Sequence, residues 1–345
     1  MIQGGTFVSL LSRIVGLFIR APLPFTALLL AAAFWTNGSW AQTKILRVGV
    51  LTVSWTEQAN MTVPAWIAPF YRTLRAHGWV EGDNVEFVHL DSAGDPTRLP
   101  EVAAEIVRMK IDVLFPVGRA ATRAAFAATR DIPIVAHDLD TDPLAAGYAK
   151  SYGHPGGHLT GVFLDAPEVA GKWLELLKTI VPELSRVVVL WDPSEGSVHV
   201  DAVRKAARAL GIKAQFVAIN TPADIDKAPS AFRGHPQAMI ILPSPMMWFQ
   251  SPRLAQLAKK YRLPATSMLV PFAEAGGMLV YGPDMAATFE QCGALVAKIL
   301  SGAKPEDLPA ERPDKFEFVL NLRTARSLRL TVPDTILLRA DKIIE

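Results

Sequence analysis

The chain has 345 residues, 50% of them hydrophobic and 20% charged, which is enough for a packed core and a length suited to two domains. Its 35 basic and 33 acidic residues nearly balance, and no Lys/Arg cluster points to a nucleic-acid surface. The single cysteine, Cys292, excludes an intramolecular disulfide. Its place in a helical pattern favours a small core residue over a reactive thiol.

Residues 1–41 have the composition of an export signal. Their only charged residues are Arg13 and Arg20, and an apolar stretch follows before the small residues Ser39 and Ala41. A retained anchor is the alternative, but the uninterrupted apolar core of about a dozen residues is short of the ~20 that span a membrane. We predict cleavage before Gln42 and an exported mature protein with 33 residues of each charge.

After Gln42, short apolar strands alternate with amphipathic helices in two rounds. The first round predicts strands at 45–51, 85–90, 111–117 and 132–136, and helices at 66–77, 99–109 and 120–129. The second predicts strands at 186–191, 214–219, 238–242, 263–268 and 277–281, and helices at 166–180, 198–210, 222–233, 252–262 and 286–300. This alternation predicts an α/β fold with two doubly wound parallel-sheet lobes.

The two rounds join at a glycine-rich stretch near residues 156–162. Doubly wound sheets bind ligands at the carboxyl ends of their strands, and two facing lobes form a cleft that closes by hinge motion. The residues directly after each strand are therefore the candidates for ligand contact.

In the first lobe, two strand ends supply candidates. Ser54 and Trp55 follow the first strand, where Trp55 either stacks on a ligand or packs at the rim. Gly118, Arg119 and Ala120 follow the third, where glycine lets the backbone approach a ligand and the next helix presents unpaired N–H groups. The Arg119 side chain either pairs with a carboxylate or lies on the surface.

The loop after strand 132–136 carries spaced acids, including Asp138 and Asp140. It fails as an EF-hand calcium loop, because Pro143 stands where glycine is needed and Ala149 stands where glutamate is needed. We predict no metal and no cofactor here. Either one of these acids receives a ligand amine, or the loop is a turn at a strand end.

In the second lobe, the stretch Asp192-Pro193-Ser194-Glu195-Gly196-Ser197 joins a strand to a helix. Ser194 can cap the helix, or the N–H groups of residues 195–197 can hold an anion. The charge of Glu195 repels a carboxylate and favours an amide or another neutral polar ligand.

A second strand end in this lobe is followed by Ser244, Met247 and Phe249. This composition suits an apolar or aromatic ligand face, with a packed loop as the alternative. The chain lacks the G-x-S-x-G, P-loop and H-E-x-x-H patterns, and no spacing supports Ser194 as a nucleophile, so the sequence shows no clear catalytic constellation.

Several stretches resemble the ABC-transporter substrate-binding protein family that includes tryptophan/tyrosine-type binders. The resemblance lies in EGDNVEF (81–87), RLPEVAAEIVRMKIDVL (98–114), IPIV (132–135), DPLAAGYAKSYGHPGGHLTGV (142–162), GKWLELLKTIVPELSRVVVLWDPSE (171–195), EAGGMLVYGP (274–283) and the tail 302–345. It implies a type I periplasmic binding protein-like fold with several hinge crossings. It also implies a periplasmic monomer that delivers a small molecule to a membrane permease and is not an enzyme. The helix starts at 118–121 and 192–197 would face the ligand from opposite lobes.

The expected lobes are 42–162 plus about 284–306, and 163–283 plus about 307–345. The sequence departs from the family pattern at residues 117–120, at His158 and in the acidic run 138–142. The ligand is therefore not fixed as one of the family's best-known aromatic amino acids. A ligand-sensing subunit of a membrane receptor and an extracytoplasmic enzyme on the same scaffold are the alternative functions.

Overall fold

The computed structural model describes residues 44–53 and 64–345, and Ile45–Glu345 form one compact unit. The predicted signal peptide and two candidate ligand contacts, Ser54 and Trp55, lie outside the described residues. Within the described ranges, we find no helix with the length and apolar character that crossing a membrane requires.

The first lobe is built on a parallel sheet. Its strands are β1 (Leu46–Thr52), β2 (Val85–Asp91), β3 (Val113–Pro116), β4 (Ile134–Asp138), β5 (Leu159–Phe163) and β11 (Ala310–Glu311). They lie in the order β11-β5-β4-β3-β1-β2, and every pair is parallel. Strands β3, β4 and β5 are buried throughout, as expected for apolar strands covered on both faces.

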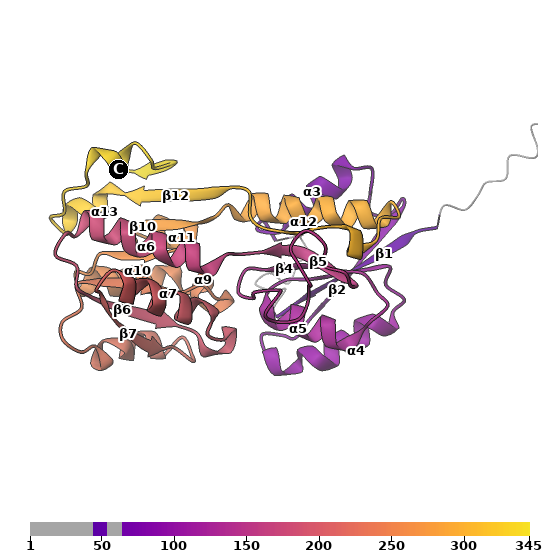
Figure 1. Ribbon diagram of the computed structural model, residues 1–345, viewed down its shortest axis with the longest axis horizontal. Helices are drawn as coiled ribbons and strands as arrows, with labels where there is room; N and C mark the ends of the chain where they lie inside the picture. Colours follow the sequence, from indigo (N-terminus) through magenta and orange to yellow (C-terminus); the bar gives the residue numbers. More distant parts are fainter. Residues whose placement is uncertain (1–43, 54–63) are drawn as a thin grey trace, which may run out of the picture. The chain divides into compact units, whose positions relative to one another are not determined.

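Helices cover both faces of this sheet (Figure 1). They are α3 (Ala68–Ala76), α4 (Leu99–Arg108), α5 (Arg119–Ala128) and α12 (Met285–Leu300), with the 3₁₀ turns η1 (Pro96–Arg98) and η4 (Pro305–Asp307). The pair α3 and α12 pack together on one face, and α4 and α5 pack together on the other. The ring of Phe70 on α3 stacks on Phe115 of β3 at 4.1 Å, which anchors the first face.

The second lobe has a mixed sheet. Its strands are β6 (Arg186–Trp191), β7 (Lys213–Ala218), β8 (Ala238–Ile241), β9 (Ala265–Ser267), β10 (Leu279–Pro283), β12 (Phe316–Asn321) and β13 (Lys342–Ile344). They lie in the order β13-β12-β10-β9-β8-β6-β7. The pairing of β10 with β12 is antiparallel, and the other pairs are parallel. The tail of the chain thus adds β12 and β13 to one edge, which the sequence pattern did not predict.

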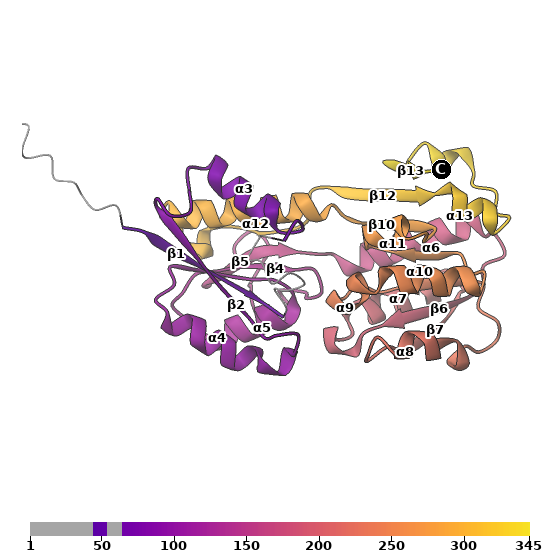
Figure 2. The same cartoon turned by 180° about the vertical axis from the view of Figure 1, so that it is seen from behind.

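Helices surround this second sheet. They are α6 (Ala166–Ile180), α7 (Val198–Ala209), α8 (Asp224–Lys227), α9 (Pro245–Phe249), α10 (Ser251–Lys260), α11 (Val270–Glu274), α13 (Leu322–Ser327) and α14 (Asp334–Leu337), with the 3₁₀ turns η2 (Pro193–Glu195) and η3 (Ala228–Ala231). Helices α6 and α7 pack together, whereas α10 packs with α8, α9 and α11, and the opposite view brings α10 to the front (Figure 2). The buried Trp173 of α6 donates its ring N–H to the carbonyl of Tyr281 at 2.7 Å, which ties α6 to β10.

The helix predicted over 222–233 is two short turns instead, α8 and η3. Pro229 has no N–H to donate, so the α-helical hydrogen-bond ladder stops before it. Most other predicted elements match the structure to within about two residues at each end, the usual spread at frayed termini.

The chain passes between the sheets at three places in its described part: after β5, after β10 and after β11. Strand β11 pairs with β5, so Ala310 and Glu311 lie in the first lobe although the expected boundary was near residue 307. Gly161 enables the close pairing of β5 and β4, because a Cβ at its φ of +150° would overlap the backbone of Ala136.

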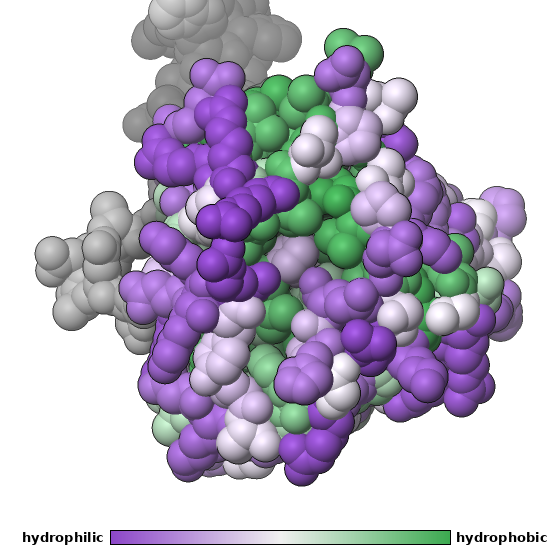
Figure 3. All heavy atoms as spheres, turned by 90° about the vertical axis from the view of Figure 1, so that its left-hand side faces the viewer, coloured by the Kyte–Doolittle hydropathy of each residue, from purple (hydrophilic) through white to green (hydrophobic). Residues whose placement is uncertain are grey.

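The end of the second lobe that carries the C-terminus has a mixed surface. Apolar side chains gather in the middle of this view, with hydrophilic side chains around them (Figure 3). Leu338, just after α14, is 87% exposed. The functional site described next lies elsewhere, at the strand ends of both sheets.

Candidate functional site

A cavity of about 200 Å³ lies between the two lobes. The first lobe contributes residues that follow β1, β3 and β4, together with Met285 and Phe289 of α12. The second contributes Glu195 and residues that follow β8 and β9. The cavity is thus formed where parallel strands end, which is where this class of sheet binds ligands.

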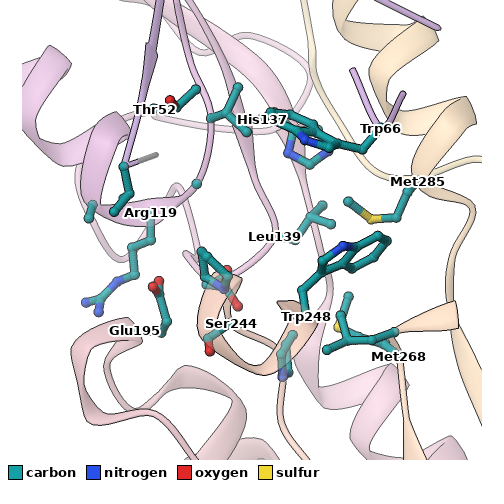
Figure 4. A pocket seen from close by; sticks show the side chains of 18 of the residues that line it. Thr52, Trp66, Arg119, His137, Leu139, Glu195, Ser244, Trp248, Met268 and Met285 are labelled. Atoms are coloured by element: carbon teal, nitrogen blue, oxygen red, sulfur yellow. The ribbon is translucent and has the colours of Figure 1, made fainter. Parts of the chain in front are cut away.

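One end of the cavity is apolar (Figure 4). It is lined by Trp66, Leu139, Trp248, Phe249, Met268, Met285 and Phe289. The Phe289 ring stacks on the His137 ring at 4.2 Å and meets Trp66 at 5.4 Å. Burial lowers the pKa of His137 to about 4, so this ring is neutral at pH 7 and adds to the apolar wall. Aromatic rings and thioethers suit a flat apolar or aromatic ligand group.

The start of α5 forms part of the opposite end. Gly118 precedes the helix with φ 89° and ψ 161°, a conformation that only glycine adopts readily. It donates its own N–H to the carbonyl of His137 at 2.8 Å and offers no side chain to cap the helix. Gly118, Arg119 and Ala120 line the cavity. The first turn of α5, whose N–H groups have no partner within the helix, therefore lies at the cavity wall.

The stretch 192–197 is built differently from the sequence expectation. The Asp192 carboxylate accepts hydrogen bonds from the N–H of Ser194 at 3.0 Å and from its hydroxyl at 2.7 Å. The N–H groups of Glu195 and Gly196 donate to the carbonyls of Asp192 and Pro193, each at 3.2 Å. A 3₁₀ turn therefore precedes α7, and the prediction that amides 195–197 stand ready for an anion fails for the first two.

Carboxylates gather at the charged end of the cavity. Asp140 and Glu195 line it from opposite lobes, and Asp138 lies fully buried behind Asp140. Burial, and then the charge of Asp140, raise the pKa of Asp138 to about 7. Burial, and then the charges of Asp140, Asp192 and Asp138, raise the pKa of Glu195 to about 8. Arg119 opposes both shifts, so its guanidinium is the nearby cation that partly offsets this negative charge.

Two contacts join the lobes beside this cluster. The His199 imidazole of α7 is buried, and its Nε2 lies 3.1 Å from the Leu139 carbonyl and 2.9 Å from an Asp140 carboxylate oxygen. The Arg119 guanidinium lies against the backbone of Gly196, where a Cβ would overlap it. Gly196 has φ +78°, so a larger residue there would also be strained.

The predicted contacts divide into two groups. Those that line the cavity are Gly118, Arg119, Ala120, Asp140, Glu195, Ser244 and Phe249. Those outside its lining are Asp138, Asp192, Ser194 and Met247. Asp138 lies behind the wall and Met247 is fully buried in the core. The Ser194 hydroxyl bonds to Asp192, an arrangement that gives it no histidine base.

Sequence reasoning missed several residues that line the cavity. These are Thr52, Trp66, His137, Leu139, Met268, Met285 and Phe289. Thr52 and His137 directly follow the predicted strands 45–51 and 132–136, so the strand-end rule covers them, but the candidates were chosen further along each loop. Trp66, Met285 and Phe289 arrive from helical segments, and nothing in their local sequence distinguishes them from core residues.

The two-lobed α/β fold is the fold of solved periplasmic binding proteins. The sequence model described as "ABC transporter substrate binding protein" matches residues 66–344. The chain belongs to this family, and the fold expected from the sequence is confirmed.

Individual relatives agree with this assignment. A tyrosine-binding protein of Clostridioides difficile (strain R20291) is 26% identical over 263 residues, 75% of each chain. A conserved domain protein of Vibrio cholerae has a TM-score of 0.77 and 24% identity, covering 87% of this chain and all of that one. An ABC domain from Streptococcus pneumonia, solved in complex with L-Trp, has a TM-score of 0.74 and 21% identity, covering 87% of this chain and 99% of the other.

Proposed function

We propose that the chain is the extracytoplasmic solute-binding subunit of an ABC importer. It closes its two lobes on one small amino-acid-like ligand and presents this ligand to a membrane permease. The observation that carries the proposal is the cavity between the lobes, with aromatic and thioether side chains at one end and charged side chains at the other.

The polarity of the cavity suggests how the ligand lies. An aromatic or large apolar group packs among Trp66, Trp248 and Met285, and a polar head group lies towards Arg119 and Glu195. The relatives that bind tyrosine and L-Trp support a ligand of this size and kind. Three chain crossings between the sheets provide the hinge at which the lobes move.

The test is a thermal-shift panel of aromatic and aliphatic amino acids, aromatic amines, aromatic acids and nucleobases on the purified protein. A ligand that binds only the folded state raises the midpoint of unfolding, and the rise grows with ligand concentration. A folded protein that no member of the panel stabilises would contradict the proposal.

A matched pair of variants locates the site. Trp248→Ala removes an aromatic wall of the cavity and should weaken the binding of the active ligand by roughly tenfold or more. Tyr261→Ala removes a ring that is 43% exposed and outside the cavity, and should leave the dissociation constant unchanged. Equal losses in both variants would place the site elsewhere.

A further inference from the structure

The charged end of the cavity holds more negative than positive charge. Within the described residues, the negative charges of Asp138, Asp140 and Asp192 all raise the pKa of Glu195, and the guanidinium of Arg119 is the cation that lowers it. His199 contributes at most one further charge, from beside Asp140, and the start of α5 contributes about half a charge. Both contributions together with Arg119 leave the carboxylates in excess.

These groups are also removed from water. Asp138 is fully buried, Asp192 is 9% exposed and His199 is 6% exposed. Excess negative charge in such a place is costly, and the raised pKa values of Asp138 and Glu195 indicate that protons neutralise part of it at pH 7. A cation from the ligand can do the same, whereas a ligand carboxylate adds to the excess.

A second observation points to a ligand in the same cavity. Thr52 lines the cavity and is 3% exposed, and its hydroxyl has no hydrogen-bond partner among the described residues. A buried hydroxyl without a partner loses free energy unless a bound molecule or water pairs with it. The cavity therefore has a hydroxyl without a hydrogen-bond partner, on Thr52, and an excess of negative charge around Glu195.

We infer that the head group recognised here is a primary ammonium, which binds between Asp140 and Glu195, and that a free carboxylate on the ligand is dispensable. The inference rests on the proposed function and narrows it to aromatic amines, with aromatic amino acids bound through the same ammonium group. The ammonium enters with its own charge, the Glu195 carboxyl gives up its proton to solvent, and the two then form a charge-assisted hydrogen bond.

Three ligands with one ring and different head groups test this inference: L-tryptophan, tryptamine and indole-3-propionate. Calorimetry at pH 7 should show that tryptamine binds at least as tightly as tryptophan. Indole-3-propionate should bind about 30-fold more weakly or worse, because its carboxylate meets the carboxylate cluster without a compensating ammonium. The same titrations in buffers of different ionisation enthalpy should show a proton released when tryptamine binds.

The proton should come from the cluster. Because Glu195 holds a proton that the ammonium displaces, tryptamine affinity should rise by up to about 50-fold from pH 6 to pH 8, and the proton release should fade above pH 8. Glu195→Gln should abolish most of the release and weaken tryptamine by about tenfold. Asp201→Asn, which changes an exposed acid on α7, should do neither.

The outcomes separate this inference from the proposed function. Tight binding of indole-3-propionate, or binding of tryptophan without tryptamine, would overturn the ammonium assignment and leave a solute-binding protein. Binding of tryptamine without proton release at pH 7 would also overturn it. If another ring from the panel is the one that binds, the same three head groups on that ring decide. If no ligand in the panel binds, both the proposed solute-binding function and the ammonium assignment are wrong.

Discussion

Two helix starts that look alike in the sequence behave differently in the structure. Gly118 precedes α5 without a side-chain cap, and the first turn of the helix lies at the cavity wall. The stretch from Asp192 folds into a turn that uses its own carboxylate and carbonyls to satisfy its N–H groups, and it sends only Glu195 into the cavity. A junction between a strand and a helix thus gives either an open helix start, as at Gly118, or a self-capped turn, and the aspartate at the end of β6 favours the turn.

The largest expected effect comes from altering the open start. Gly118→Ala places a Cβ on a backbone with φ 89° and ψ 161°, so the variant should lose about 3 kcal/mol of stability and most of its ligand affinity. Denaturant unfolding and calorimetry measure the two losses. Gly171→Ala, within α6 and with nothing near the added Cβ, is the control and should be neutral or slightly stabilising. If Gly118→Ala were as stable as the wild type, the start of α5 would not require the backbone conformation that glycine provides.

The second prediction concerns Glu195, the residue that the self-capped turn at 192–197 places in the cavity. The folded-state pKa of Glu195 is raised from 4.5 to about 8, so the folded chain binds a proton that the unfolded chain releases, and stability falls as pH rises through this interval. Glu195→Gln lacks this loss. Without ligand it should match the wild type near pH 4.5 and exceed it at pH 9 by on the order of 2 kcal/mol, measured by denaturant unfolding. If the wild type and the variant were equally stable at pH 9, burial and the neighbouring carboxylates would not raise the pKa of Glu195.

The smallest effect tests the cap of the closed turn. Asp192→Ala removes the acceptor for the N–H and hydroxyl of Ser194 and should cost about 1 kcal/mol of unfolding free energy. The chain supplies a close control in Asp95, which makes the same pair of bonds to Thr97 on the surface. Asp95→Ala should cost a similar amount. Asp192→Ala alone should also lower the pKa of Glu195, seen as a shift in the pH at which proton release fades. If proton release faded at the same pH in both variants, the charge of Asp192 would not act on Glu195.

The regular elements follow from the sequence because their burial pattern is local. Short apolar runs rich in valine, such as residues 186–191, favour covered strands, and the structure has β6 at those residues. The C-terminal tail was missed because its short strands gain their partners from far away. Strand β12 pairs antiparallel with β10, and β11 pairs with β5 about 150 residues earlier in the chain. The local hydrophobic pattern of the tail does not indicate which strands β11 and β12 pair with.

The site was predictable to the extent that strand ends define it. Gly118, Arg119 and Glu195 follow directly from that rule, whereas Phe289 is set by the packing of α12 against the first lobe. Met247 shows the opposite error: it follows a strand and is apolar, but the short α9 turns it into the core. Which face of a short helix meets a ligand depends on tertiary packing, which single residues do not reveal.

The interleaved order of the lobes has a consequence for how the molecule is made. Residues 285–311 supply the helix that covers α3 and the edge strand beside β5, and they are translated only after β6 to β10. A nascent chain that ends before Met285 would leave the rings of Phe115 and His137 without their contact to Phe289. The first lobe is therefore complete only after residue 311 has been translated, and the second only after the strands of the tail have followed it.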